Sequence, residues 1–311
     1  MLIDRLIEKI RELHSPIVVG LDPRLEQIPA AFKEPYYQTD GKTPATAAKI
    51  ILTWGKEIID QVCDLVPAVK PQIAMYEQFG APGIDCYIQT VGYAKSKGLV
   101  VIGDIKRGDI AEIAGAYSDG HIGMVKIGGS SHPVFNEDFI TVNPYLGYDA
   151  VEPFLANCEK YGKGLFILVK TSNKSSGDIQ DLATKDGAVY EIIAGLIKKW
   201  GAHIKGESGY SSIGAVVGAT HPEQAKKIRQ ILPEAFFLVP GYGAQGGTAE
   251  DLAACFDNKG LGAVVNSSRG IIFAYMDDKY KRDFPEDEFE MASRQACIDM
   301  REDLKRITGL K

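Results

Sequence analysis

The chain alternates between short apolar runs of three to five residues and longer amphipathic stretches. Each apolar run is followed by a polar or glycine-rich segment and then by a helical pattern. Unbroken Val, Ile and Leu runs of this length are typical of parallel strands that are buried on both faces. We therefore predict eight strands, over residues 17–20, 66–69, 99–102, 139–142, 165–169, 213–217, 236–239 and 263–265.

Eight consecutive β/α units favour a closed (β/α)8 TIM barrel of the α/β class over an open doubly wound sheet. An amphipathic helix is predicted before the first strand, at 4–13, and another near the end of the chain, at about 286–308. Because no segment has the composition of a linker, residues 1–311 are expected to form a single domain. The extra length is interpreted as loop insertions at 24–43, 120–138, 174–186 and 279–287.

The 311 residues are 45% hydrophobic and 24% charged, which suits a folded soluble protein with a large core. The net charge is -6 and no basic tract is present, so neither nucleic acid nor a membrane is expected as a partner. The apolar runs are too short to cross a bilayer, and the N-terminal helix is too mixed in charge for a signal peptide. Five scattered cysteines indicate reduced thiols in a cytoplasmic protein.

Charged residues gather where the first three predicted strands end. The third strand leads into Asp104, Lys106 and Asp109, and the first two strands lead to Asp22 and Lys70. Strand side chains alternate between faces, so Asp104 and Lys106 are expected to point the same way. For an isolated motif, a solvated turn with a surface salt bridge is an equally good interpretation. Reactive groups of (β/α)8 barrels lie at the carboxyl ends of the strands, however, which favours an active site.

Alternating charges in this cluster would hold each lysine protonated and each carboxylate ionised. A lysine held in this way can donate a proton, but it cannot act as a Schiff-base nucleophile, which needs a depressed pKa. No metal and no cofactor are predicted, because the histidines are scattered and are expected at the surface or at helix caps. The five histidines are His14, His121, His132, His203 and His221.

Two loops near the end of the chain have the composition of a phosphate site. PGYGAQGG, residues 240–247, is rich in glycine, so its backbone N–H groups can approach an anion closely. NSSRGI, residues 266–271, offers Arg269 as a bidentate phosphate donor. Taken alone, the first loop could be an ordinary glycine turn, and the arginine of the second could be an ordinary surface residue. Together they follow strands seven and eight, where these barrels commonly bind phosphate, and 242–247 is the expected lid.

Six sequence blocks, in this order, resemble the orotidine 5'-phosphate decarboxylase family, and most closely its longer, bacterial-type subfamily. They cover most of the chain, and the third block with the two phosphate loops is the specific part of the signature. The blocks are GLDP at 20–23, VKPQ at 69–72, DIKRGDI at 104–110, VKTSN at 169–173, PGYGAQGG at 240–247 and NSSRGI at 266–271.

The resemblance implies a decarboxylation of orotidine 5'-phosphate to UMP, without metal or cofactor, as the last step of de novo pyrimidine synthesis. It implies that Lys106 protonates C6 as carbon dioxide leaves, that Asp104 faces the substrate carboxylate and that Lys70 completes the charge network. Asp109 would reach the partner's site across a homodimer interface. The implied substrate contacts are Asp22 for ribose, Ser172 with Asn173 for the pyrimidine, and Gln245, Arg269, Gly241 and Gly243 for the phosphate.

The chain departs from the short form of the family at Ile113, where that form has a threonine that contacts the neighbouring ribose. Other interpretations are an aldolase, a magnesium-binding hexulose-phosphate synthase, or a nucleotide-binding barrel without catalysis. The paired lysines and aspartates disfavour the aldolase, and the KRG within DIKRGDI disfavours the synthase. A binding barrel would keep the phosphate loops but would not need the charge network.

Overall fold

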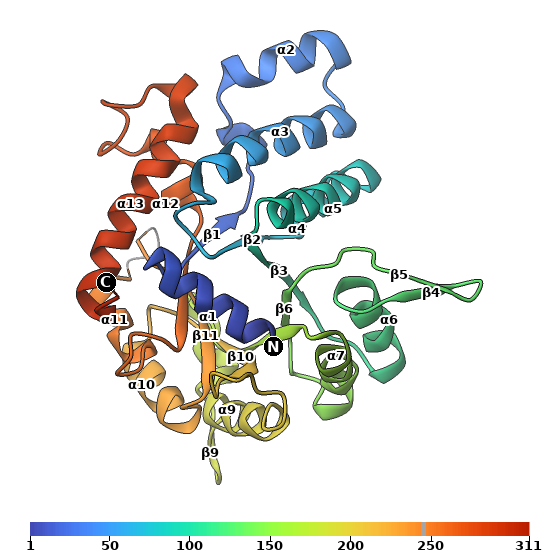
Figure 1. Cartoon of the computed structure of the whole chain (residues 1–311), viewed down its shortest axis with the longest axis vertical. Coiled ribbons are helices and arrows are strands. Elements are labelled where there is room, and N and C mark those ends of the chain that lie inside the picture. The colour runs from blue at the N-terminus through green and yellow to red at the C-terminus, as the bar shows by residue number, and fades with distance from the viewer. Residues whose placement is uncertain (244–246, 311) are drawn as a thin grey trace.

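The structure is a computed structural model that describes residues 1–243 and 247–310 (Figure 1). Its centre is a closed parallel barrel whose strands follow one another in chain order, with the last strand paired to the first. The predicted (β/α)8 barrel is therefore confirmed. Its strands are β1 (Ile17–Leu21), β2 (Ala68–Pro71), β3 (Val100–Arg107), β6 (Phe139–Val142), β7 (Gly164–Lys170), β10 (Ser211–Val217), β11 (Ala235–Pro240) and β12 (Ala263–Ser267).

Helices surround the barrel and connect its strands (Figure 1). None of the helices in the described part of the chain is long and apolar enough to cross a membrane. The helices are α1 (Leu2–Leu13), α2 (Ala30–Asp40), α3 (Pro44–Val62), α4 (Ala74–Glu77), α5 (Ala81–Ser96), α6 (Ala111–His121), α7 (Tyr148–Tyr161), α8 (Gly177–Gln180), α9 (Val189–Trp200), α10 (Pro222–Ile231), α11 (Ala249–Leu252), α12 (Arg269–Ile272) and α13 (Phe289–Thr308).

The four predicted insertions form local structure of their own. The first contains α2, which packs on α3, and the second contains a hairpin of β4 (Val125–Ile127) and β5 (Ser130–His132) that projects beside α6 (Figure 1). The third contains α8 and enters a small hairpin of β8 (Ala183–Thr184) and β9 (Gly187–Ala188). The fourth leads into a 3₁₀ turn, Glu286–Glu288, so the C-terminal α-helix starts three residues later than predicted.

Strand β3 differs most from its predicted extent, because it continues to Arg107 instead of ending at residue 102. The prediction ended this strand before Gly103, since four charged residues follow that glycine within six positions. The strand continues because two of those residues, Asp104 and Lys106, line the cavity at the mouth of the barrel. Gly103 itself is needed for packing: a Cβ there would lie 2.7 Å from Oε1 of the buried Glu137.

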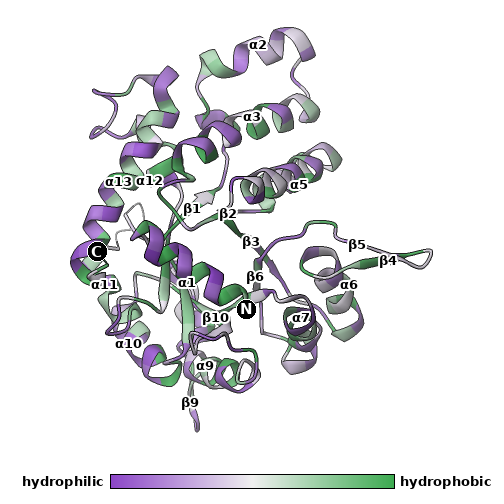
Figure 2. Ribbon diagram, viewed as in Figure 1, coloured by the Kyte–Doolittle hydropathy of each residue, from purple (hydrophilic) through white to green (hydrophobic). Residues whose placement is uncertain are grey.

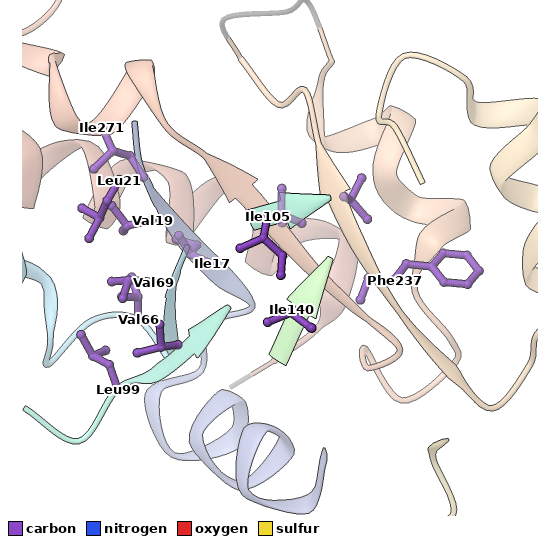
Figure 3. Close-up of a cluster of buried hydrophobic side chains, with 14 of the residues drawn as sticks. Ile17, Val19, Leu21, Val66, Val69, Leu99, Ile105, Ile140, Phe237 and Ile271 are labelled. Carbon is purple, nitrogen blue, oxygen red and sulfur yellow. The ribbon is translucent and has the colours of Figure 1, made fainter. Parts of the chain in front are cut away.

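Strand side chains alternate between two apolar clusters. Ile17 and Val19 belong to the outer cluster, which lies between strands and helices, and part of it is drawn in Figure 3. Val18, between them, belongs to the inner cluster, where it packs with Leu6 and Ile7 of α1. Each such buried aliphatic side chain contributes about 1.5–3 kcal/mol.

Helix α1 thus closes one end of the barrel, and the site described below lies at the opposite end. Figure 2 shows hydrophilic and hydrophobic residues alternating along α1, α3 and α13, as in helices with one buried face. The buried face of α1 consists of Leu2, Ile3, Leu6, Ile7 and Ile10.

Candidate active site

A cavity of about 660 Å³ opens at the carboxyl ends of the strands, and every strand of the barrel contributes to its lining, β1 through Asp22, the residue that follows it. This is the end at which (β/α)8 barrels carry their active sites. The predicted site residues that the cavity brings together are Asp22, Lys70, Asp104, Lys106, Ser172, Asn173, Gly241 and Arg269.

Two predicted residues do not line this cavity, and a third lies outside the part of the chain that the structure describes. Asp109 lies two residues beyond β3, half-buried, and its Oδ1 accepts a hydrogen bond from the backbone N of Ile110 at 2.8 Å. Gly243 lines a neighbouring cavity beside α13. Gln245 lies outside the described residues.

The carboxylate of Asp104 accepts four hydrogen bonds, two on each oxygen. Lys70 Nζ and Gln72 Nε2 donate to Oδ2 at 2.8 and 3.0 Å. Lys106 Nζ and the hydroxyl of Thr141 donate to Oδ1 at 2.5 and 2.9 Å. The lone pairs of this carboxylate are thus all used within the protein, which fixes its position in the pocket wall.

Burial and charge oppose each other in this cluster, and charge prevails. Lys70 and Asp104 are only 4% and 6% exposed, and removing such ions from water costs several kcal/mol for each unless they are paired. Burial raises the pKa of Asp104, but the charges of Lys70 and Lys106 outweigh it and hold that pKa well below the usual range. Burial lowers the pKa of Lys70, and the charges of Asp104 and Asp22 outweigh it and raise that pKa above 10.5.

Lys106 differs from Lys70 in being accessible. Its side chain is 46% exposed, and its ammonium is held at the pocket wall by Asp104. Its backbone has a φ of +45°, a left-handed conformation that costs a non-glycine residue about 1–3 kcal/mol. Strain of this kind persists where surrounding contacts enforce it, and it is common at functional sites.

Asp22 lies at the mouth of β1, with Oδ1 3.9 Å from Lys70 Nζ. Among the described residues, this buried Oδ1 and the nearby Oδ1 of Asn266 have no hydrogen-bond partner. Buried acceptors without partners are rare and costly, so the pair is suited to a ligand that brings hydroxyl donors. The mouths of β1 and β12 are close because Gly20 has no side chain: a Cβ there would lie 2.7 Å from Cβ of Ser268.

The predicted phosphate loops lie side by side at the rim. Gly241 and Gly243 have φ of +109° and +68°, a backbone region that favours glycine. Arg269 is exposed at the start of α12 and lines the cavity, so its guanidinium is free to meet an anion from solvent. Sequence reasoning placed Tyr242 in the expected lid but did not predict its contact with α13, in which its hydroxyl donates to Oδ2 of Asp303 at 2.5 Å.

The loop after β7, which carries Ser172, is fixed by contacts that sequence reasoning missed. Lys170 is fully buried and donates to both carboxylate oxygens of Asp181 at 2.8 Å. Thr171 N donates to Oε1 of Gln180, and Gln180 Nε2 donates back to Thr171 Oγ1, both at 2.9 Å. The sequence signal for this ion pair was a lysine, Lys170, at the end of a buried strand. Its partner Asp181 lies in a segment that was interpreted as an insertion, so the pair was not predicted.

The interpretation of the histidines holds for four and is wrong for His121. His14 and His221 occupy helix-cap positions, and the other two are exposed. His121 is buried, with Nδ1 2.9 Å from Glu137 Oε1, and its ring stacks on Phe135. A buried carboxylate partner allows a histidine to leave water. Within residues 1–243 and 247–310, no group of three or more His, Cys, Asp or Glu side chains could hold a metal ion.

A charged cavity at the carboxyl ends of a closed parallel barrel defines this protein as a (β/α)8-barrel enzyme. Residues 15–281 match the family model described as "Orotidine 5'-phosphate decarboxylase / HUMPS family". The chain therefore belongs to that family, as the six sequence blocks predicted.

Individual relatives agree with this assignment over nearly the whole chain. The sequence is 42% identical over 301 residues to the orotidine 5'-phosphate decarboxylase of Caldicellulosiruptor bescii, covering 97% of each chain. It is 43% identical over 312 residues to that of Clostridium tetani, covering 100% of each. Among solved structures, that of Leishmania donovani OMP decarboxylase is similar, with a TM-score of 0.73 and 29% sequence identity, and the match covers 99% of each chain.

Proposed function

We propose that the protein converts orotidine 5'-phosphate to UMP and carbon dioxide, the last step of de novo pyrimidine synthesis. The names of its relatives support this reaction. The observation that carries the proposal is the buried carboxylate of Asp104, held between the ammonium groups of Lys70 and Lys106 at the wall of an open pocket.

In the proposed reaction, the bond from C6 to the substrate carboxyl carbon breaks, and its electron pair stays on C6 as carbon dioxide leaves. Lys106 then gives its proton to C6, becomes a neutral amine, and is reprotonated from solvent. A fixed ammonium beside the developing carbanion stabilises it without reorganisation. The exposure of Lys106 supports this role, because reprotonation requires contact with water.

The other predicted contacts divide between the reacting end and the remote end of the substrate. The charge of Asp104 next to the substrate carboxylate would disfavour the bound ground state. Asp22 would accept hydrogen bonds from ribose hydroxyls, Ser172 with Asn173 would contact the pyrimidine, and Arg269 would bind the phosphate. Binding energy at the phosphate can be used to hold the reacting end against the charge network.

We also infer a homodimer in which Asp109 contributes to the partner's site. In support, Asp109 lies outside the cavity of its own chain, beside Ile110, which is 63% exposed. The neighbouring loop after β6 carries Tyr145, which is 78% exposed, and its Asn143 N donates to Arg107 O at 2.8 Å. A shared apolar face at the mouths of β3 and β6 suits an isologous contact.

The cytoplasm is the location that we infer for this activity. The five cysteines are free, and four of them are buried, which suits a reducing compartment. The predicted absence of nucleic-acid and membrane partners rests on the net charge of -6.

A direct assay tests the reaction. Purified protein is given orotidine 5'-phosphate in excess EDTA, and UMP release is measured. We expect full turnover, and activity that EDTA abolishes would count against a metal-free mechanism. Lys106→Ala should lower kcat by at least about 10³-fold while UMP still binds, since a proton donor and a fixed charge are lost together.

Lys259→Ala, an exposed lysine before β12 at the opposite end of the barrel, is the matched control and should keep wild-type turnover. Unchanged turnover in Lys106→Ala would overturn the assignment of the proton donor. UMP binding without decarboxylation by the wild-type protein would instead indicate a nucleotide-binding barrel.

A further inference from the structure

The hydroxyl of Thr141 contacts both members of the proton-donor pair. Thr141 lies in β6, is 1% exposed, and was not singled out by the sequence. The backbone N of Lys106 donates to Thr141 Oγ1 at 2.9 Å, and Oγ1 donates to Asp104 Oδ1 at 2.9 Å. A backbone N–H can only donate and an ionised carboxylate can only accept, so the hydroxyl proton has one possible direction.

The hydroxyl occupies a break in the pairing of β3 with β6. Gly103 pairs with Ile140, and the next pair is Arg107 with Val142, so four steps along β3 match two along β6. Such bulges re-aim side chains next to active sites. Within this bulge Lys106 has its left-handed backbone, and its N–H bonds to the Thr141 side chain instead of a carbonyl of the neighbouring strand.

We propose that Thr141 is a positioning residue: its hydroxyl holds Lys106 in the left-handed conformation and orients Asp104 to receive the Lys106 ammonium. The proposal rests on the proposed role of Lys106 as proton donor. Without the hydroxyl, a backbone donor and one oxygen of Asp104 each lose a partner, and Lys106 is held through its side chain alone. Valine has nearly the shape of threonine, so it removes the hydroxyl and little else.

The test compares Thr141→Val with Thr141→Ser. Thr141→Val should lower kcat by about 10- to 100-fold, because small displacements of reacting groups have effects of this size. Its KM and its Kd for UMP should stay within about threefold of wild type, because Thr141 lines the cavity but its hydroxyl is already committed to Lys106 and Asp104. Thr141→Ser, which keeps the hydroxyl, should recover kcat to within about threefold.

Thr90→Val is the matched control. Thr90 is 3% exposed, and its hydroxyl donates to Cys86 O within α5, away from the cavity. This variant should lower Tm while leaving kcat unchanged, which separates a loss of stability from a loss of positioning. If Thr141→Val does not fold, Thr141→Ala provides the same comparison with Thr141→Ser.

Three results would overturn the proposal: a kcat for Thr141→Val close to wild type, no recovery with serine, or a loss confined to KM. Failure of the proposed function has a different signature. It would appear as an inactive wild-type protein, or as full turnover in Lys106→Ala, whatever the Thr141 variants do.

Discussion

Lys106 Nζ lies 2.5 Å from Asp104 Oδ1, although the two residues are separated by a single position on one strand. Ile105, between them, is buried in the outer cluster, so the two charged side chains share the pocket side of β3. Lys70 occupies the other oxygen of the same carboxylate. One buried carboxylate therefore holds two ammonium groups, so a change at Asp104 affects both lysines.

Replacing Asp104 with asparagine should damage both activity and stability. The amide leaves the buried ammonium of Lys70 with only the more distant carboxylate of Asp22, at 3.9 Å, as a counter-charge, which costs up to about 3–5 kcal/mol in the free energy of unfolding. It also frees Lys106, so kcat should fall by at least about 10²-fold. Urea unfolding and turnover assays measure the two effects.

The double variant Lys70→Met/Asp104→Asn is the control for this prediction. It removes the orphaned buried charge, so it should regain part of the lost stability without regaining activity. Equal stability of the single and double variants would show that the ammonium of Lys70 does not destabilise the fold once Asp104 is neutral.

The charge network should be ionised across a wide pH range. Burial raises the pKa of Asp104, but the charges of Lys70 and Lys106 outweigh it and lower that pKa in the folded state. The ionised carboxylate therefore contributes its full stability above pH 3.8. This contribution is lost as pH falls through the lower folded-state pKa. Burial lowers the pKa of Lys70, but the charges of Asp104 and Asp22 outweigh it and raise that pKa in the folded state. The ammonium of Lys70 therefore contributes its full stability below pH 10.5. This contribution is lost as pH rises through the higher folded-state pKa.

The measurable consequence is the difference in unfolding free energy between wild type and Asp104→Asn. This difference should be constant across the neutral range, should shrink below the ordinary pKa of an aspartate, and should shrink again as pH rises towards the ordinary pKa of a lysine and Lys70 loses its proton. A difference that grows as pH falls from about 7 to 5 would mean that Asp104 titrates with a raised pKa, and one that does not shrink below about pH 4 would mean that its pKa is not depressed.

Much of this fold and site could be predicted because both depend on local pattern and strand order. The eight strands follow from apolar runs, and parallel strands that are consecutive in a barrel bring Asp22, Lys70 and Asp104 to neighbouring positions. The alternation of side chains along a strand correctly placed Asp104 and Lys106 on one side. These relations need no knowledge of how distant loops fold.

What the sequence did not predict depends on contacts between ordinary residues far apart in the chain. Thr141 is one threonine in an apolar strand, and its role arises from a bulge in β3 that no residue pattern announces. The ion pair of Lys170 and Asp181 depends on the path of an inserted segment. His121 is buried because Glu137, sixteen residues later, is buried beside it.

Replacing Arg269 with alanine should weaken the binding of phosphorylated ligands specifically. A hydrogen bond to a charged group is worth about 1.5–3 kcal/mol, so KM for orotidine 5'-phosphate should rise by about 10- to 100-fold. The reaction of the nucleoside orotidine, which has no phosphate, should be nearly unchanged. Comparing kcat/KM for the two substrates isolates the phosphate contact.

Arg282→Ala provides the matched control, because Arg282 is exposed and does not line the cavity. Its kinetics with both substrates should equal those of wild type. If Arg269→Ala reduced kcat/KM equally for the nucleotide and the nucleoside, Arg269 would act on the shape of the pocket and not on the phosphate.

A mixture of two inactive variants tests the shared site. In the proposed dimer, Asp109→Ala and Lys106→Ala homodimers both lack a complete site, whereas a heterodimer has one complete site and one doubly damaged site. Random exchange in a 1:1 mixture makes half the dimers heterodimers, so activity should recover to about a quarter of wild type. The matched control mixes Asp104→Ala with Lys106→Ala, residues that contact each other within one chain, and should not recover. A mixture of the first pair that stays as inactive as its components would show that Asp109 does not act across the interface.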